Sequence, residues 1–295
     1  MSGATLQLRV GLRRRPQKFL LCSVALICSV IAAQRASAAD WPGSAPVLRG
    51  TVSPGYVRWD GWQAGIQAGF GNMNADFGNS TSSLVAFILR NSTLEAEGGV
   101  STWTTLPSNT TTGPVFGGFV GYNWQWSELV VGWDLAYKRP ASLNSTASDS
   151  LSRRFDTSDS VRHDVTTDAQ TSFKLVDYAT LRGRAGYAFG EFLPYAFLGA
   201  AVGRFNYQTT VTVTDVMTDL TVAPPVPGDL GTFMQSANSG QKNVFVAGLA
   251  TGLGIDWAIT PSVFLRAEWE YALFGPVNDT RSNINVGYLG LGARF

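Results

Sequence analysis

Cysteine, histidine and long apolar runs are scarce in this sequence. It has two cysteines and one histidine, and charged residues make up 15% of it. Both cysteines, Cys22 and Cys28, lie in a leader segment, so the rest of the chain contains none and depends on no disulfide. After that leader no apolar stretch approaches 18 residues, which excludes helical membrane spans.

The start of the chain has the pattern of an export signal. Five cations and no acid stand in the first 18 residues, and an uncharged, mostly apolar run of 15 residues follows over 19–33. Ala36-Ser37-Ala38 then offers the small residues that a signal peptidase cuts, which predicts a cleaved segment 1–38. A twin-arginine route is a weaker alternative, because Arg13-Arg14-Arg15 lacks the usual flanking residues.

The acidic balance of the remaining chain argues against a nucleic-acid partner. The leader holds six of the 22 lysines and arginines and none of the 21 acids, which leaves 16 cations against 21 acids, a net charge of −5. Residues 39–60, with three prolines, are predicted to be a flexible periplasmic lead-in. One periodic pattern then occupies 61–295, so we expect a single domain there.

A period of two runs through this domain. Over 263–273, apolar residues alternate with Arg266, Glu268 and Glu270, and charges at every second residue indicate a strand rather than a helix. The same alternation predicts eight strands: 62–70, 116–124, 129–137, 175–189, 193–207, 245–257, 263–273 and 289–295.

Charge placement distinguishes a membrane barrel from a soluble β protein. A soluble sandwich or barrel turns its apolar faces inward, whereas here the charges gather on the faces that alternate with the apolar ones. The apolar faces must therefore meet lipid, where a mid-depth Arg or Lys costs roughly 2–4 kcal/mol. The outward faces hold only Asp177, near a rim. The predicted inward charges are Glu128, Asp134, Lys138, Arg182, Arg184, Arg204, Asp256, Arg266, Glu268, Glu270 and Arg294.

Aromatic residues are predicted to form two girdles at the membrane boundaries, where amphipathic rings are favoured. The periplasmic set is Trp62, Trp124, Trp126, Tyr187, Phe189, Tyr195, Trp257 and Phe295. The outer set is Tyr137, Phe205, Tyr207 and Tyr271.

The connections alternate in length, which is typical of a bacterial barrel. Long polar loops are predicted outside, and tight turns in the periplasm. The predicted loops are 72–112, 138–174 and 208–242, with a shorter one at 275–283, and the turns are 125–127, 190–192 and 258–262. The fold class is therefore an all-β, antiparallel, up-and-down transmembrane barrel, most simply of eight strands. Ten strands are the alternative, because 84–89 and 208–217 could each extend a hairpin above the membrane.

At this point the chain resembles the small opacity-type and OmpA-like eight-stranded outer-membrane barrels, particularly the RopB-like proteins of alphaproteobacteria. The resemblance is carried by Ala36-Ser37-Ala38, by the strand that opens with Gly61-Trp62, by Arg182-Gly183-Arg184 and its neighbours, and by the terminal Phe295. It implies a surface-exposed structural barrel of the Gram-negative outer membrane with no catalytic residue to transfer. It also implies that the assembly machinery reads the last strand through Phe295. The loops are longer than usual, and no peptidoglycan-binding domain follows the barrel.

The interior of an eight-stranded barrel is narrow enough for side chains to fill it, so inward charges must find partners. Counting from the turns places Asp134 and Arg184 at about the same height on adjacent strands. We predict a cross-strand ion pair between them, and the alternative is a solvated lumen whose charges share water. The further members of the predicted network are Glu268, Glu270, Arg182 and Arg266.

No motif in the sequence indicates an enzyme, a cofactor or a metal. The glycines of 248–254 lie within a predicted strand and no helix follows them, whereas a dinucleotide-binding loop lies between a strand and a helix, so these glycines do not indicate one. His163 lies near Ser160 in an acidic loop, but a hydrolase needs an oriented base, a nucleophile and an oxyanion site. The nearby acids match no calcium loop and are Asp156, Asp159, Asp164 and Asp168.

Two functions are compatible with these patterns. The first is a structural barrel that displays surface loops, with an envelope-integrity or surface-interaction role. The alternative is a small passive pore, and a lipase or deacylase is a distant third. The expected partners are outer-membrane lipids and lipopolysaccharide, together with the assembly machinery; the sequence names no extracellular ligand.

Overall fold

The computed structural model describes residues 57–295, so the predicted leader and most of the predicted lead-in lie outside the described residues. The domain is almost entirely strand. Its elements are β1 (Gly61–Asp76), α2 (Ser82–Ile88), α3 (Thr93–Gly98), the short 3₁₀ helix η2 (Val100–Thr102), β2 (Asn109–Trp126), β3 (Leu129–Pro140), β4 (Asn144–Asp156), β5 (Val161–Tyr187), β6 (Phe192–Asp219), β7 (Gly231–Ala258), β8 (Val263–Val277) and β9 (Thr280–Arg294). Among these described residues, no helix is long and apolar enough to cross a bilayer.

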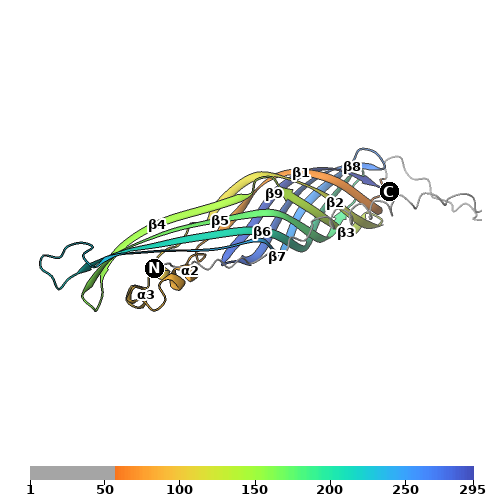
Figure 1. The fold of residues 1–295 in the computed structure, drawn as a ribbon. Coiled ribbons are helices and arrows are strands. Elements are labelled where there is room, and N and C mark those ends of the chain that lie inside the picture. The colour runs from red at the N-terminus through yellow and green to blue at the C-terminus, as the bar shows by residue number, and fades with distance from the viewer. Residues whose placement is uncertain (1–56) are drawn as a thin grey trace, which may run out of the picture. The chain divides into compact units, whose positions relative to one another are not determined.

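The strands form one antiparallel sheet that closes on itself (Figure 1). Its order is β3-β2-β1-β9-β8-β7-β6-β5-β4, and a further pairing of β3 with β5 completes the ring. β3 pairs with the inner part of β5, from Leu129↔Tyr187 to Lys138↔Tyr178, and β4 pairs with its outer part. β3 and β4 thus lie end to end along the same edge of β5 and together fill one position of the ring, so the ring has eight positions. The predicted eight-stranded up-and-down barrel is confirmed.

Two of the predicted long loops are largely strands. Residues 138–174 include β4 and the outer part of β5, and 208–242 include the outer parts of β6 and β7. Thr alternates with Val over much of β6 beyond the membrane band, which suits a sheet with one buried and one hydrated face. The extension proposed for 208–217 is therefore correct, whereas the loop assignments of 138–174 and 208–242 are wrong.

The first loop forms helices instead of the hairpin considered for 84–89. Val85, Ile88 and Leu89 are buried together, at the spacing that places them on one face of α2. α3 follows, with the Ser92 hydroxyl accepting from the Glu95 N–H as an N-cap, and Gly99 in the left-handed region at its C-cap. An apolar run of this length is compatible with either structure, and packing over the barrel mouth decides for the helix.

The two faces of the sheet follow the predicted segregation at the level of the membrane. Ile66, Leu181 and Leu289 face outward and are 71%, 56% and 72% exposed, while Arg182 and Arg266 are 1% exposed inside the ring. The periplasmic aromatic girdle is present except for one member. Its exposed members are Trp62, Trp124, Trp126, Tyr187, Phe189, Trp257 and Phe295.

β6 has the opposite phase to the predicted one. Tyr195 and Phe205, predicted to face lipid, are 5% and 0% exposed in the interior, and Arg204, predicted inward, faces outward and pairs with Asp177. Large rings fill the interior at β6, so both faces of this strand are apolar. Arg204 was then the only charge from which the inward face could be predicted, and it faces outward. A β-bulge between Leu175 and Asp177 places Asp177 outward, as predicted. Glu128, also predicted inward, is exposed at the inner turn.

The interior is tight enough to require glycine at some positions. A Cβ at Gly252 would lie 2.0 Å from the Trp269 carbonyl oxygen and 2.5 Å from the Phe197 ring. No side chain fits there unless the backbone moves, because carbon atoms pack at about 3.5–4.0 Å. Glycine at such inward positions therefore makes room for the large interior side chains.

Candidate functional site

The interior of the barrel is the first candidate site, because buried charges gather in it. Arg182 on β5 donates to three carboxylates: its Nε lies 2.6 Å from Asp134 Oδ1, and its Nη1 lies 2.5 Å from Glu268 Oε1 and 3.1 Å from Glu270 Oε2. Lys138 donates to Glu270 from the other side. These side chains come from β3, β5 and β8, so the network crosses the lumen.

A second group of charges is centred on Asp256. Arg184 Nη2 donates to Asp256 Oδ2 over 2.7 Å, and Arg266 donates to both carboxylate oxygens over 2.8 and 3.0 Å. Asp134 links the two groups, since its Oδ2 lies 3.8 Å from Arg184 Nη1 and 3.7 Å from Arg266 Nη1.

The predicted pair between Asp134 and Arg184 is therefore an ion contact without a hydrogen bond. Asp134 stands directly opposite Arg182 in the register, and Arg182 takes the hydrogen bond. Counting from the turns gave the correct strands and missed the register by two residues. The other predicted members, Glu268, Glu270 and Arg266, belong to the same network.

Tyrosines and phenylalanines that sequence reasoning did not assign to the network complete it. Tyr195 donates to Glu268 Oε2 over 2.8 Å, and Tyr178 donates to Glu270 Oε1 over 2.9 Å. The guanidinium groups lie over rings: Arg184 is 3.8 Å from the centre of Tyr195, and Arg266 is 3.9 Å from that of Phe119. Four carboxylates and four cations thus share one desolvated space with aromatic walls, a geometry that favours stable pairing.

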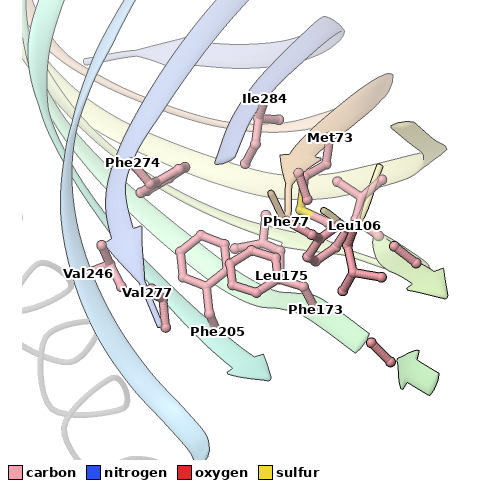
Figure 2. Packing of buried hydrophobic residues seen from close by; sticks show 14 of the residues in the cluster. Met73, Phe77, Leu106, Phe173, Leu175, Phe205, Val246, Phe274, Val277 and Ile284 are labelled. Atoms are coloured by element: carbon pink, nitrogen blue, oxygen red, sulfur yellow. The ribbon is translucent and has the colours of Figure 1, made fainter. Parts of the chain in front are cut away.

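An apolar layer fills the outer end of the interior. Figure 2 shows Phe173, Phe205 and Phe274 turned toward one another inside the ring, and the first two rings stack with their centres 5.0 Å apart. Phe77 meets Phe173 edge to face at 6.4 Å, and Val85 and Leu89 of the α2 segment belong to the same cluster. The first loop thus packs into the barrel mouth.

A smaller apolar layer fills the inner end. Trp59 is fully buried there and contacts the Phe264 ring edge to face at 6.0 Å. Arg294 lies over Trp59 at 4.2 Å and donates to the Arg58 and Pro261 carbonyls. Barrel packing therefore begins before Gly61. Together, the two apolar layers and the charged network fill the interior at three levels.

His163 is the second candidate site, and it lies in the outer part of the sheet. It is 4% exposed, its Nδ1 lies 2.7 Å from Asp215 Oδ2 on β6, and its ring stacks on Phe155 at 5.6 Å. Burial raises the pKa of the Asp215 carboxyl. The acidic partner is therefore Asp215 on the neighbouring strand β6, rather than one of the acids that the sequence placed beside His163.

Two of the four acids that lie near His163 in the sequence pair with arginines instead. Asp156 pairs with Arg162 over 2.8 Å, and Asp164 pairs with Arg154. Ser160 lies in the β4–β5 turn with a positive φ of 62°, and within residues 57–295 no hydrogen bond joins it to His163. The described residues also contain no group of three or more His, Cys, Asp or Glu side chains placed to hold a metal.

Comparison with known proteins identifies the barrel. A family model described as an outer membrane protein beta-barrel domain matches residues 23–295. The chain belongs to this family. This outer-membrane barrel has no match among curated proteins.

Solved structures similar to this barrel include three small outer-membrane barrels. Ail of Yersinia pestis is 13% identical, with 80% of this chain and 99% of Ail covered and a TM-score of 0.31. Neisserial surface protein A is 15% identical, with 79% and 97% covered and a TM-score of 0.31. The N-terminal barrel domain of Pseudomonas aeruginosa OprF is 14% identical, with the same coverages and TM-score.

Proposed function

We propose that this protein is a closed structural barrel of the outer membrane that presents its outer sheet to the cell exterior for envelope integrity or surface contacts. The observation that carries the proposal is the filled interior. Arg182 and Arg266 are each 1% exposed, and apolar layers pack on both sides of their network. A conducting path would have to break these ion pairs and displace aromatic side chains.

The outer sheet supports the surface role. The outer part of β7 pairs only with β6, since its pairing with β8 begins at Gly248↔Phe274. Residues 231–241 contain neither charge nor proline, the features that normally protect a free edge. Such an edge suits main-chain contacts with an extended partner segment.

A catalytic role is not part of the proposal. The lone histidine is held by Asp215 and covered by Phe155, and this geometry suits a packing role for a buried polar pair. Substituting His163 by Gln in a purified lipase or deacylase assay should leave any background activity unchanged.

Conductance of the refolded protein in a planar bilayer tests closure. We expect no steady openings, because the mixed-sign network neutralises itself and leaves no water-filled path. Steady openings would reject the closed barrel and favour the passive pore.

Single-cysteine labelling of whole cells tests which end faces outward. The described residues contain no cysteine, so Met234→Cys in the outer part of β7, 70% exposed in the wild type, reports on that end alone. A membrane-impermeant maleimide should label it on intact cells. The matched control, Ser262→Cys in the β7–β8 turn, should be labelled only after the cells are opened. Reversed labelling would reject the orientation.

A further inference from the structure

A cluster of cations lies on the outward face just beyond the apolar band. On β3, Arg139 is the next outward residue after Tyr137, which is 52% exposed. On β6, Arg204 follows Val202, which is 48% exposed, in the same way. Lys174 stands beyond the β5 bulge and is exposed. β3, β5 and β6 are neighbours in the ring, so these cations share one side of the barrel.

The single acid of this region is already neutralised. Arg204 Nε lies 3.0 Å from Asp177 Oδ1, its Nη2 contacts the second carboxylate oxygen, and Tyr137 donates to Asp177 Oδ2 over 2.9 Å. An ion pair on an outward face is tolerated only where the lipid headgroups begin, so this pair marks the outer boundary of the hydrocarbon.

The other cations of the cluster have no such partner. Among the residues that the structure describes, Arg139 and Lys174 make no ion pair within 4 Å, nor does Lys242 at the adjoining bulge of β7, beyond Phe245. These three exposed cations lie on β3, β5 and β7, within four consecutive strands of the ring, and leave excess positive charge at headgroup depth. The acids farther out on this face, such as Asp168, lie beyond Lys174 along β5.

We propose that Arg139, Lys174 and Lys242 form a binding site for the phosphate groups of the outer-leaflet glycolipid. Arginine and lysine are the side chains that pair with phosphate, and their charge acts most strongly within a Debye length of an anionic surface. The acyl chains of the same lipid would lie against the apolar band directly below, on Leu135, Leu198 and Val202. This site goes beyond the proposed function and rests on one part of it, the orientation that places the outer end of the barrel at the outer leaflet.

Binding of lipid A to the refolded full-length chain in detergent micelles tests the site. Native mass spectrometry of lipid titrations compares bisphosphorylated lipid A with the same lipid after removal of its phosphates. We expect the wild type to prefer the phosphorylated form. The double variant Arg139→Gln/Lys174→Gln should lose about 30-fold in affinity, or about 2 kcal/mol for two surface cations.

A charge-matched control separates a site from general attraction. Arg90→Gln/Arg281→Gln removes two exposed cations elsewhere in the outer region and should change the affinity less than about twofold. Equal losses in both double variants would overturn the proposal, as would equal affinity for the dephosphorylated lipid. Displacement of the lipid by an equal concentration of inorganic phosphate would reassign the cluster to free anions and overturn the lipid site.

A measurement on the wild type keeps the proposal testable if the double variant fails to fold. Raising the salt concentration should weaken the binding of phosphorylated lipid A and leave that of the dephosphorylated lipid unchanged, because exposed charges are screened by salt. Salt-independent binding of both lipids would overturn the proposal.

Discussion

The inner and outer halves of the same strands have opposite polarity. In the inner half of β5, Arg182 and Arg184 face the interior and Leu181 faces outward, 56% exposed. In the outer half of β5, Val165 and Phe173 are fully buried in the interior, while Gln170 is exposed on the outward face. The bulge between Leu175 and Asp177 shifts the alternation by one residue, so that even-numbered side chains face the interior on its inner side and odd-numbered ones on its outer side.

This reversal shows that the surroundings of the sheet, rather than the fold alone, set its pattern. Where lipid surrounds the ring, apolar side chains are favoured outside and paired charges fill the lumen. Where water surrounds it, the strands follow the rule of soluble sheets and enclose an apolar core. The Asp177–Arg204 pair lies at the level where one rule gives way to the other.

The largest expected effect comes from breaking the inner network. Arg182→Ala leaves Asp134, Glu268 and Glu270 without their shared cation, and removing one partner of a buried pair costs about 3–5 kcal/mol. Urea unfolding in lipid vesicles, followed by tryptophan fluorescence, measures the loss. The adjacent lipid-facing variant Leu181→Ala should lose much less, and equal losses would mean that the network does not stabilise the barrel.

A charge placed on the outward face tests the contrast between the halves. Leu181→Arg puts a cation against the hydrocarbon and should cost roughly 2–4 kcal/mol. Gln170→Arg, on the outward face of the outer half of the same strand, should change the free energy of unfolding by less than about 0.5 kcal/mol. A similar cost at both positions would contradict the reversal of polarity.

Interior substitutions test the same contrast from within. Val213→Thr buries a hydroxyl in the apolar outer core and should cost about 1–3 kcal/mol. The converse change in the inner half, Thr180→Val, should be neutral within about 0.5 kcal/mol, because the interior there already combines rings with polar groups. Amide hydrogen exchange along β5 and β6 measures the stability of the inner and outer halves separately. A destabilising Thr180→Val would show that the Thr180 hydroxyl is needed.

The smallest expected effect is the loss, at low pH, of the hydrogen bonds that join Glu97 of α3 to Ser158 in the β4–β5 turn. The Ser158 hydroxyl and amide both donate to Glu97, over 2.6 and 2.9 Å, and these hydrogen bonds lower the pKa of the Glu97 carboxyl. A lowered folded-state pKa stabilises the contact above the ordinary pKa and loses that stability as pH falls through the lowered value. The protection of the Ser158 amide, measured as its exchange rate relative to the intrinsic rate at the same pH, should therefore fall as the Glu97 carboxyl becomes protonated in acid. The Glu97→Gln variant should show less protection at neutral pH and little further loss in acid; unchanged protection in the variant would mean that the Glu97 carboxylate does not hold the Ser158 amide.

The inner half was predictable because lipid imposes a strict alternation on it. The charges of 263–273 and 181–185 gave strands, faces and most members of the network directly. The register was not predictable, since a shift of two residues keeps every side chain on the same face, and Asp134 accordingly took Arg182 instead of Arg184.

The outer half was harder to predict for the same physical reason. Ser and Thr residues on a hydrated strand resemble a loop, so β4 and the outer parts of β5 and β7 were missed. The pairing of His163 with Asp215 depends on the alignment of β5 with β6 over a stretch that was assigned to loops. The predicted phase of β6 was wrong because aromatic rings line its interior face while other apolar residues, such as Leu198 and Val202, line its lipid face, so neither face stands out as polar.

Spin labels on the outward faces of β5 and β6 test the central claim most directly. Single cysteines would replace Leu181 and Leu198 in the inner half, and Gln170 and Gln208 in the outer half, and relaxation by oxygen would be compared with that by a water-soluble nickel chelate in lipid vesicles. Oxygen, which partitions into hydrocarbon, should dominate at 181 and 198, and the chelate at 170 and 208. The same relaxation profile at all four positions would contradict the account.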